Sequence, residues 1–176
     1  KIWVYETANY LNATPAVSGD RIIFGGCDAI LHVVSGTTGK AVAKVELGQE
    51  CHVASAPAIA GDKVFMGHYG NEFICVDLKT NKQLWKYVNR QQPFFSSPSL
   101  AEDRVVFGGR DKWLHCVKRS DGSRLWTFPT RRKIDGSPVI CGDKVVFGSG
   151  DGRIYTLSLK DGTLIAKYEI GRPIFS

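Results

Sequence analysis

The chain has 176 residues, of which 43% are hydrophobic and 11% aromatic, and its formal net charge is +6 at pH 7. This size and composition indicate one globular domain with enough apolar residues for a sizeable core. No apolar run approaches the roughly 20 residues that a membrane-spanning helix needs, and the N-terminal residues lack the pattern of a signal peptide. The five cysteines show no CxxC spacing, which excludes the usual zinc and haem signatures.

One phrase occurs four times along the chain. Its copies are GDRIIFGGCDA from Gly19, GDKVFMGHYGN from Gly61, EDRVVFGGRDK from Glu102 and GDKVVFGSGDG from Gly142. The second residues of these copies, all aspartates, are separated by 42, 41 and 40 residues: Asp20, Asp62, Asp103 and Asp143. A period of about 20 to 50 residues indicates a solenoid, a propeller or an array whose units pack against their neighbours.

The third unit shows which of these architectures applies. Four short strands are predicted in it, at SSPSLA, VVFGG, KWLHCVK and RLWTF, with polar turns at EDR, RD and RSDGS between them. The polar link PTRRKIDG follows the last strand, and helical periodicity is absent. Four antiparallel strands in about 40 residues are the dimensions of a β-propeller blade. An ordinary β-sandwich is the alternative, but four copies in phase argue against it.

The period divides residues 1–176, taken as a single propeller segment, into predicted parts. The blades are expected at 12–53, 54–94, 95–134 and 135–170. Residues 1–11 are expected to be the outer strand of a preceding blade, and residues 171–176 the start of a next blade. These ends favour a part of a larger ring, or a half-ring that pairs with a second copy, over a complete four-bladed ring.

The strand turns carry a motif that resembles a known family. CVDLKTNKQLW, residues 75–85, resembles the docking motif Ala-x-Asp-x-x-x-Gly-Lys-x-x-Trp of the PQQ-like repeat, and CVKRSDGSRLW, residues 116–126, keeps its glycine and tryptophan. The copies ending at Ala43 and Ala166 keep the glycine but lack the tryptophan. The chain therefore resembles the PQQ-like, quinoprotein-type β-propeller family, which includes the outer-membrane assembly lipoprotein BamB and quinoprotein dehydrogenases.

This resemblance implies an all-β propeller of four-stranded antiparallel blades, with about four blades in this chain as part of a seven- or eight-bladed ring. It also implies that tryptophans on the outer strands dock onto the adjoining blade, each with its indole nitrogen hydrogen-bonded to the backbone. The tryptophans at these positions are Trp3, Trp85 and Trp126.

Catalytic machinery is not expected in this chain. The resemblance to quinoprotein dehydrogenases implies adjacent cysteines, a stacked tryptophan and a calcium site, yet no two cysteines are adjacent and the acidic residues are spread one per turn. Cys75 and Cys116 share one small-residue position that favours core packing, and His32 and His115 are two blades apart, too distant for one metal ion. We expect no catalytic residue, no cofactor and no metal.

Positive charge is concentrated in the second half of the chain. Residues 104–133 contain nine lysines and arginines but only two aspartates. Propeller topology places the turns between second and third strands, and the links between blades, on one side of the disc. The cations on that side, the predicted partner-binding residues, are Arg90, Arg110, Lys112, Arg131, Arg132, Lys133, Arg153 and Arg172. On the other side, the repeated aspartates are balanced by neighbouring lysines and arginines.

The sequence therefore predicts a non-catalytic, BamB-like scaffold for protein–protein interaction. The expected ligand of its positive face is an acidic or extended segment of a protein partner, or a second copy of the chain; a solvated face without a partner is the alternative. Nucleic acid is disfavoured because no aromatic residues are interleaved with these cations.

Three further alternatives stay open. In the first, the chain is a fragment of a PQQ-dependent dehydrogenase whose catalytic blades are missing. In the second, it is a propeller domain appended to a larger multidomain enzyme. The third concerns the location. The family resemblance implies a periplasmic or otherwise exported protein, but five cysteines with at least one free thiol suit the reducing cytoplasm equally well.

Overall fold

The computed structural model describes residues 2–48 and 51–175. These residues form sixteen β-strands in four antiparallel sheets of four strands, and the strand order in each sheet follows the chain. None of the described residues belongs to a helix that could cross a membrane. The fold is thus all-β, and each predicted blade interval contains one complete sheet.

Each sheet is one blade. Blade one consists of β1 (Ala16–Ser18), β2 (Arg21–Gly25), β3 (Ile30–Ser35) and β4 (Ala41–Glu46). Blade two consists of β5 (Ala58–Ala60), β6 (Lys63–Gly67), β7 (Glu72–Asp77) and β8 (Lys82–Val88). Blade three consists of β9 (Ser99–Leu100), β10 (Arg104–Gly108), β11 (Trp113–Lys118) and β12 (Arg124–Pro129). Blade four consists of β13 (Val139–Cys141), β14 (Lys144–Gly148), β15 (Arg153–Ser158) and β16 (Leu164–Glu169).

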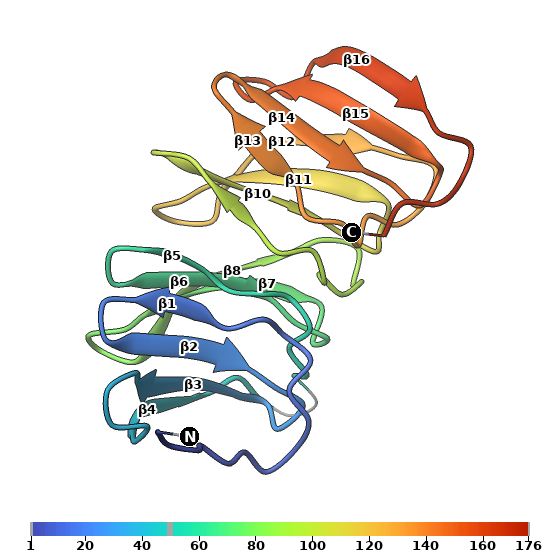
Figure 1. The fold of residues 1–176 in the computed structure, drawn as a ribbon. Helices are drawn as coiled ribbons and strands as arrows, with labels where there is room; N and C mark the ends of the chain where they lie inside the picture. The colour runs from blue at the N-terminus through green and yellow to red at the C-terminus, as the bar shows by residue number, and fades with distance from the viewer. Residues whose placement is uncertain (1, 49–50, 176) are drawn as a thin grey trace.

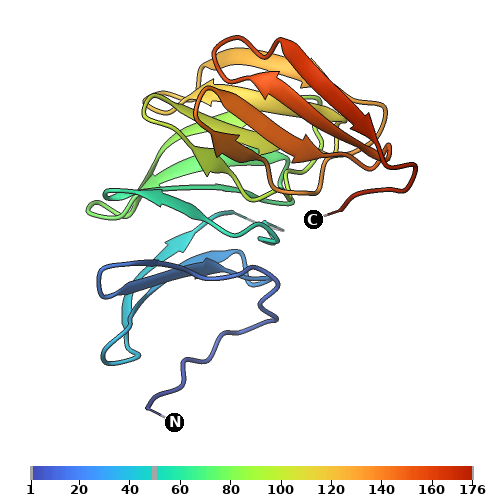
Figure 2. The same ribbon diagram turned by 45° about the horizontal axis from the view of Figure 1, so that its top comes forward.

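The blades follow one another as an arc. Figures 1 and 2 show the sheets stacked face to face in chain order, with blade one and blade four at opposite ends. The short first strands of neighbouring blades contact one another, β1 with β5, β5 with β9 and β9 with β13, and so define the inner edge of the arc. The turns and links therefore lie along its two sides.

Packing between successive sheets forms the core. The middle strands of a blade are covered on both faces, as the fully buried Val64 and Phe65 of β6 show. Val64 belongs to an apolar cluster with residues of blade one, whereas Phe65 belongs to the next cluster with residues of blade three. The same arrangement is repeated between blades three and four. A run of consecutive apolar residues forms a strand here because both of its faces are buried.

A tryptophan on the outer strand of one blade forms a hydrogen bond to the next blade at two boundaries, between blades two and three and between blades three and four. Trp3, in the segment before blade one, makes the same contact with blade one. The hydrogen bonds run from Nε1 to a backbone carbonyl: Trp3 to Gly36 at 2.8 Å, Trp85 to Arg119 at 3.2 Å and Trp126 to Leu159 at 3.0 Å. We call this contact the indole latch.

A second contact crosses the boundary between blades two and three. The Tyr87 hydroxyl lies 3.1 Å from Nδ1 of His115, whose Nε2 lies 3.1 Å from Asp111 Oδ1. His115 is completely buried. We call this arrangement the Tyr–His–Asp relay, and it is repeated at the N-terminal end of the arc by Tyr5, His32 and Asp28.

Residues 2–11 differ from the expectation of an outer strand. The structure does not assign them to a strand, because no described strand lies beside them to share backbone hydrogen bonds. Trp3 and Tyr5 nevertheless fill the latch and relay positions against blade one. The segment thus covers the face of blade one in the way that an outer strand covers the next blade.

The latch generates a first prediction. We expect Trp126→Ala to lower the free energy of unfolding by about 3–5 kcal/mol, the usual cost of truncating a large buried side chain. Gly162→Ala should also destabilise the protein, because a Cβ there would lie 2.7 Å from the Trp126 ring and φ is 74°. Urea unfolding measures both changes.

Leu125→Ala is the matched control for these variants, since Leu125 is the neighbour of Trp126 on β12 and is 42% exposed. The free energy of unfolding of Leu125→Ala should stay within about 1 kcal/mol of that of the parent chain. An equal loss in Leu125→Ala and Trp126→Ala would contradict the latch.

The relay generates a second prediction, on pH. Burial raises the pKa of Asp111, but hydrogen bonds from His115, Asn89 and the Trp113 amide outweigh it and hold the pKa below its usual range. Asp111 therefore stabilises the fold above its unfolded pKa of about 3.9, and this contribution is lost as the pH falls through the lowered folded value. In Asp111→Asn we expect about 1–3 kcal/mol lower stability at neutral pH and a shallower decline in acid.

Urea unfolding of both proteins between about pH 6 and pH 3 measures that decline. Parallel stability curves for the parent chain and Asp111→Asn would show that this carboxylate does not titrate with folding.

Candidate functional site: a basic loop face

The candidate site is one side of the arc, where the turns between second and third strands meet the links between blades. We call it the basic loop face. It contains the eight predicted cations, Arg90, Arg110, Lys112, Arg131, Arg132, Lys133, Arg153 and Arg172. All but Arg153, which is the first residue of β15, lie outside the strands, in turns, in links or after β16. The short strands and tight turns therefore fix the backbone that carries them.

Two of the cations form ion pairs with the same carboxylate. Arg110 Nε lies 3.0 Å from Asp135 Oδ1, and Lys133 Nζ lies 2.6 Å from Asp135 Oδ2. Arg110 also stacks 3.9 Å over the ring of Phe95. Burial raises the pKa of Asp135, but the bonds from Arg110 and Lys133 outweigh it, so the pKa is lowered and the carboxylate stays charged. This cluster ties two successive loops together.

Two further cations have partners of their own. Arg153 Nη2 lies 3.3 Å from Glu169 Oε1, across the β15–β16 pair in which the two residues face each other. Arg90 stacks 4.7 Å over the ring of Trp113. Arg153 is thus engaged in an ion pair, whereas Arg90 forms no ion pair with any residue that the structure describes.

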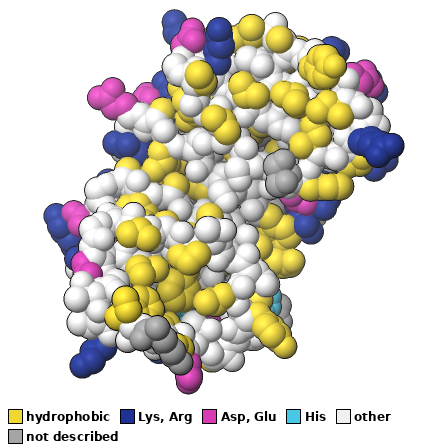
Figure 3. All heavy atoms as spheres, in the orientation of Figure 1, with side chains coloured by type: hydrophobic (Ala, Val, Ile, Leu, Met, Phe, Trp, Pro, Cys, Tyr) yellow, Lys and Arg dark blue, Asp and Glu magenta, His cyan; other side chains and the backbone are white. Residues whose placement is uncertain are grey.

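The remaining four cations are exposed, and within residues 2–48 and 51–175 none of them forms an ion pair through its side chain. They are Lys112, Arg131, Arg132 and Arg172. Figure 3 shows dark blue side chains at the loop that follows β16, at the right-hand edge of the molecule. The uncompensated charge of this side is therefore concentrated on the loops of blades three and four.

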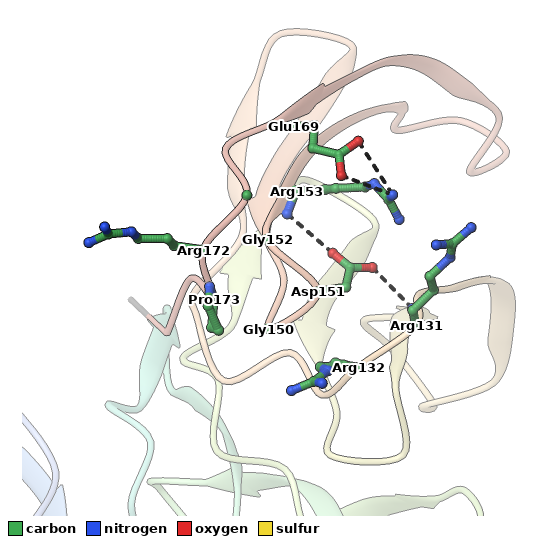
Figure 4. Close-up of a pocket in the computed structure, with 10 residues that line it drawn as sticks. Arg131, Arg132, Gly150, Asp151, Gly152, Arg153, Glu169, Arg172 and Pro173 are labelled. Carbon is green, nitrogen blue, oxygen red and sulfur yellow. Dashed lines mark hydrogen bonds and ion pairs between the residues drawn. The ribbon is translucent and has the colours of Figure 1, made fainter.

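A cleft of about 390 Å³ lies among three of these arginines. The link after β12, the turn between β14 and β15, and the link after β16 form its walls. The Asp151 carboxylate joins two of these walls, since it accepts hydrogen bonds from the backbone amides of Arg131 (3.1 Å) and Arg153 (3.2 Å). In Figure 4 the guanidinium groups of Arg131 and Arg153 lie on the same side of the cleft as Glu169. The side chains of Arg132 and Arg172 point away from this group.

The opposite side of the arc carries balanced charge. Lys79 Nζ lies 2.8 Å from Asp62 Oδ2, and Arg104 Nε lies 2.7 Å from Asp103 Oδ1. The backbone carbonyls of the repeated aspartates also accept a bond from the residue after the third strand, as Asp62 does from the Leu78 amide. These aspartates thus act as turn residues.

The predicted non-catalytic residues occupy buried positions. Cys75 and Cys116 are completely buried between blades, and burial raises the pKa of each thiol to about 12. His32 and His115 belong to separate relays. Among the described residues, no three His, Cys, Asp or Glu side chains are placed to hold a metal ion. With no adjacent cysteines and no such group of acidic ligands, these residues do not fit a quinone with its calcium ion.

The sequence did not identify the carboxylates that neutralise part of the basic loop face. Asp135 is two residues from Lys133 in the same link, a spacing that could have indicated the pair. Glu169 faces Arg153 only through strand register. The relays also have a signal that was missed, because the spacing Asp-x-x-x-His occurs at both Asp28 and Asp111.

Comparisons with known proteins agree with this geometry. A family model described as outer membrane protein assembly factor BamB matches residues 1–128 and, in a second alignment, residues 28–174. None of the curated proteins compared with the chain matches it.

Several solved structures share the fold. BamB from Moraxella catarrhalis is 21% identical with a TM-score of 0.82, over 95% of this chain and 55% of that chain. The computationally designed Ika4 protein is 17% identical with a TM-score of 0.80, over 90% of this chain and 98% of that chain. The quinohemoprotein alcohol dehydrogenase ADHIIG from Pseudomonas putida HK5 is 14% identical with a TM-score of 0.80, over 96% of this chain and 35% of that chain.

The chain spans about half of the BamB structure. Sequence identities this low show a shared fold alone. The family model, in contrast, matches nearly every residue of the chain and so shows the family. The chain belongs to the PQQ-like β-propeller family, whose model carries the description outer membrane protein assembly factor BamB.

Proposed function

We infer that this chain is a non-catalytic propeller scaffold whose basic loop face binds an acidic or extended segment of a protein partner. Membership of the family described as an outer membrane protein assembly factor supports a scaffold role. A rigid propeller also suits this role, since its loops form a broad surface with few free sheet edges. The proposal includes a periplasmic or otherwise exported location, which rests on the same family.

The observation that carries the proposal is the cleft walled by loops of blades three and four. Arg131, Arg132 and Arg172 are exposed at its rim. An arginine guanidinium is weakly hydrated and presents a planar fork of donors that matches a carboxylate. These three groups have no ion pair among the described residues and point in different directions (Figure 4), so they favour an extended ligand that carries several carboxylates.

The rest of the face strengthens this interpretation. Lys112 is exposed and Arg90 keeps its charge over Trp113, so positive potential continues from the cleft toward the loops of blade three. On the opposite side, Lys79 and Arg104 form local ion pairs with Asp62 and Asp103. A field of this kind accelerates the approach of an acidic partner and orients it toward one side of the arc.

A catalytic role for the chain has one observation in its favour, the structural match to a quinohemoprotein alcohol dehydrogenase. At 14% identity this match concerns the fold alone. The cysteines that could contact a quinone are buried between blades, and burial raises the pKa of both thiols to about 12. We therefore keep the scaffold role for this chain.

Charge reversal tests the proposed face. We expect Arg131→Glu, Arg132→Glu and Arg172→Glu, combined in one variant, to weaken binding of an extended peptide with alternating glutamates by at least about tenfold, because each reversal replaces attraction by repulsion. Lys133 and Arg110 are left unchanged, since their ion pairs with Asp135 hold the loops together. Fluorescence anisotropy with a labelled peptide measures the affinity.

The matched control reverses three exposed lysines on the opposite side, Lys40, Lys144 and Lys160, which gives the same net charge. Its affinity should stay within about threefold of the parent chain at physiological salt. If both variants lose the peptide equally, net charge rather than this face determines binding.

A second measurement tests the absence of a quinone site. Pyrroloquinoline quinone and calcium are added to the chain, and the visible absorption is recorded after gel filtration. We expect no chromophore to elute with the protein, because the chain lacks adjacent cysteines and an acidic cluster. A quinoprotein dehydrogenase in the same procedure is the positive control, and stoichiometric retention by this chain would overturn the scaffold proposal.

A further inference from the structure

Three aromatic rings form a row on the basic loop face, around blade two. Tyr69 belongs to the turn between β6 and β7, whereas His52 and Phe95 belong to the links that lead into β5 and β9. The ring centroids of His52 and Tyr69 lie 5.8 Å apart, and those of Tyr69 and Phe95 lie 4.3 Å apart. Arg110, from the turn between β10 and β11, lies 3.9 Å over the ring of Phe95. We call the three rings the aromatic ledge.

Hydrogen bonds hold the ledge in place. The amide of Tyr69 donates to the carbonyl of His52 at 2.9 Å, and the same bond between turn and link recurs in each of the other three blades. Nδ1 of His52 donates to the carbonyl of Cys27 at 2.9 Å, which sets the orientation of the imidazole ring. The ledge therefore needs little rearrangement to receive a ligand, and little of the binding energy is spent on ordering it.

The repeat does not require aromatic residues at these positions. The equivalents of Tyr69 in the other blades are Cys27, Arg110 and Gly150, and those of Phe95 are Asn12, Ala54 and Asp135. Tyr69 is 47% exposed and Phe95 is partly exposed, whereas the adjacent Phe94 is completely buried. Phe94 thus serves the core, and the two rings beside it are accessible. Neighbouring exposed aromatic rings are typical of an interaction site.

The geometry of the ledge favours an aromatic ligand. The planes of His52 and Tyr69 are inclined to each other by 83°. A third ring placed against both can therefore lie parallel to one and perpendicular to the other. These are the offset-stacked and edge-to-face arrangements that aromatic pairs prefer.

Charged groups connect the ledge to the cleft. Arg110, which stacks on Phe95, also forms an ion pair with Asp135. Asp135 pairs in turn with Lys133, in the link after β12, and Arg132 of the same link lines the cleft. The ledge and the cleft thus belong to one surface across blade three. An extended chain on this surface can place an aromatic side chain at the ledge and carboxylates at the cleft.

We propose that the aromatic ledge binds an aromatic side chain of the same extended acidic segment whose carboxylates bind the arginines of the cleft, an inference that rests on the proposed function. The segment lies across blade three, with its ring against His52 and Tyr69. Aromatic anchors typically carry a large share of the binding energy of an interface, whereas exposed charges mainly accelerate and orient the approach. The ledge therefore determines which acidic segments are bound tightly.

Single-stranded nucleic acid is the alternative ligand, because a ring and a cation are adjacent here in space although they are not interleaved in the sequence. Such a ligand brings a phosphate next to each stacked base and is favoured by an unpaired cation there. The cation beside the ledge, Arg110, is instead paired with Asp135. An acidic peptide fits better, since its carboxylates can lie several residues away from its ring.

Labelled peptides test the proposal. One peptide alternates glutamate with serine, and three others carry a tryptophan in place of the first, the middle or the last serine. We expect the best of the tryptophan peptides to bind the parent chain at least about tenfold more tightly than the serine peptide, as measured by fluorescence anisotropy. Tyr69→Ala should abolish this difference, because it removes the central ring of the ledge.

The matched control is Tyr168→Ala, which truncates another exposed tyrosine, on β16 and outside the ledge, and should keep the difference. Urea unfolding verifies that Tyr69→Ala is folded. Tyr69→Ser, close in size to the Cys27 that blade one carries there, is a second variant with the same expected result. The three arginine reversals at the cleft should weaken the tryptophan peptides as well, and unchanged affinity would overturn the connection between ledge and cleft.

The outcomes separate this inference from the proposed function. Equal affinities of the tryptophan and serine peptides, all weakened by the arginine reversals, would overturn the ledge but keep the acidic ligand. Absence of binding by every peptide would overturn both. Tighter binding of single-stranded oligothymidine than of any peptide, lost in Tyr69→Ala, would identify nucleic acid as the ligand instead. A dimer of the parent chain that Tyr69→Ala dissociates in sedimentation would assign the ledge to a second copy and overturn the proposal.

Discussion

Face-to-face packing between successive sheets is the constraint on which the structure depends. A four-stranded blade has two apolar faces and cannot bury either alone, so every middle strand, such as β6 or β10, needs a neighbour on each side. The indole latch and the Tyr–His–Asp relay add directional bonds to this packing. They fix the rotation of one blade against the next, and through it the positions of the loops that form the basic loop face.

The periodic sequence predicted the fold in detail. Each interval derived from the spacing of four aspartates contains one sheet, because identical wedges must recur at equal distances along the chain. The electrostatics of the loops could not be predicted in the same way. Whether Arg153 is free depends on the register that brings Glu169 beside it, and the state of Arg110 depends on the fold of a link that holds Asp135. Contacts of this kind are set by loop geometry, which no repeat period describes.

The residues that first suggest chemistry serve the boundaries. Buried cysteines, histidines and aspartates occur at repeat positions, and their partners come from the neighbouring blade or the adjacent turn. In a repeat protein, a polar residue that recurs in phase is more informative about packing than about function. The residues that vary between copies, the arginines of the loops among them, carry what distinguishes one blade from another.

The boundary between blades one and two has a different character from the rest. Ala43 and Val45 occupy the latch and relay positions there, and the buried contacts across it are aliphatic, with an exposed ion pair at 3.9 Å between Arg21 and Asp62. Such contacts resist separation but impose little orientation. Blade one, with residues 2–11 attached by their own bonds, therefore meets the other three blades mainly through packing, without the directional bonds of latch and relay that orient the later blades against one another.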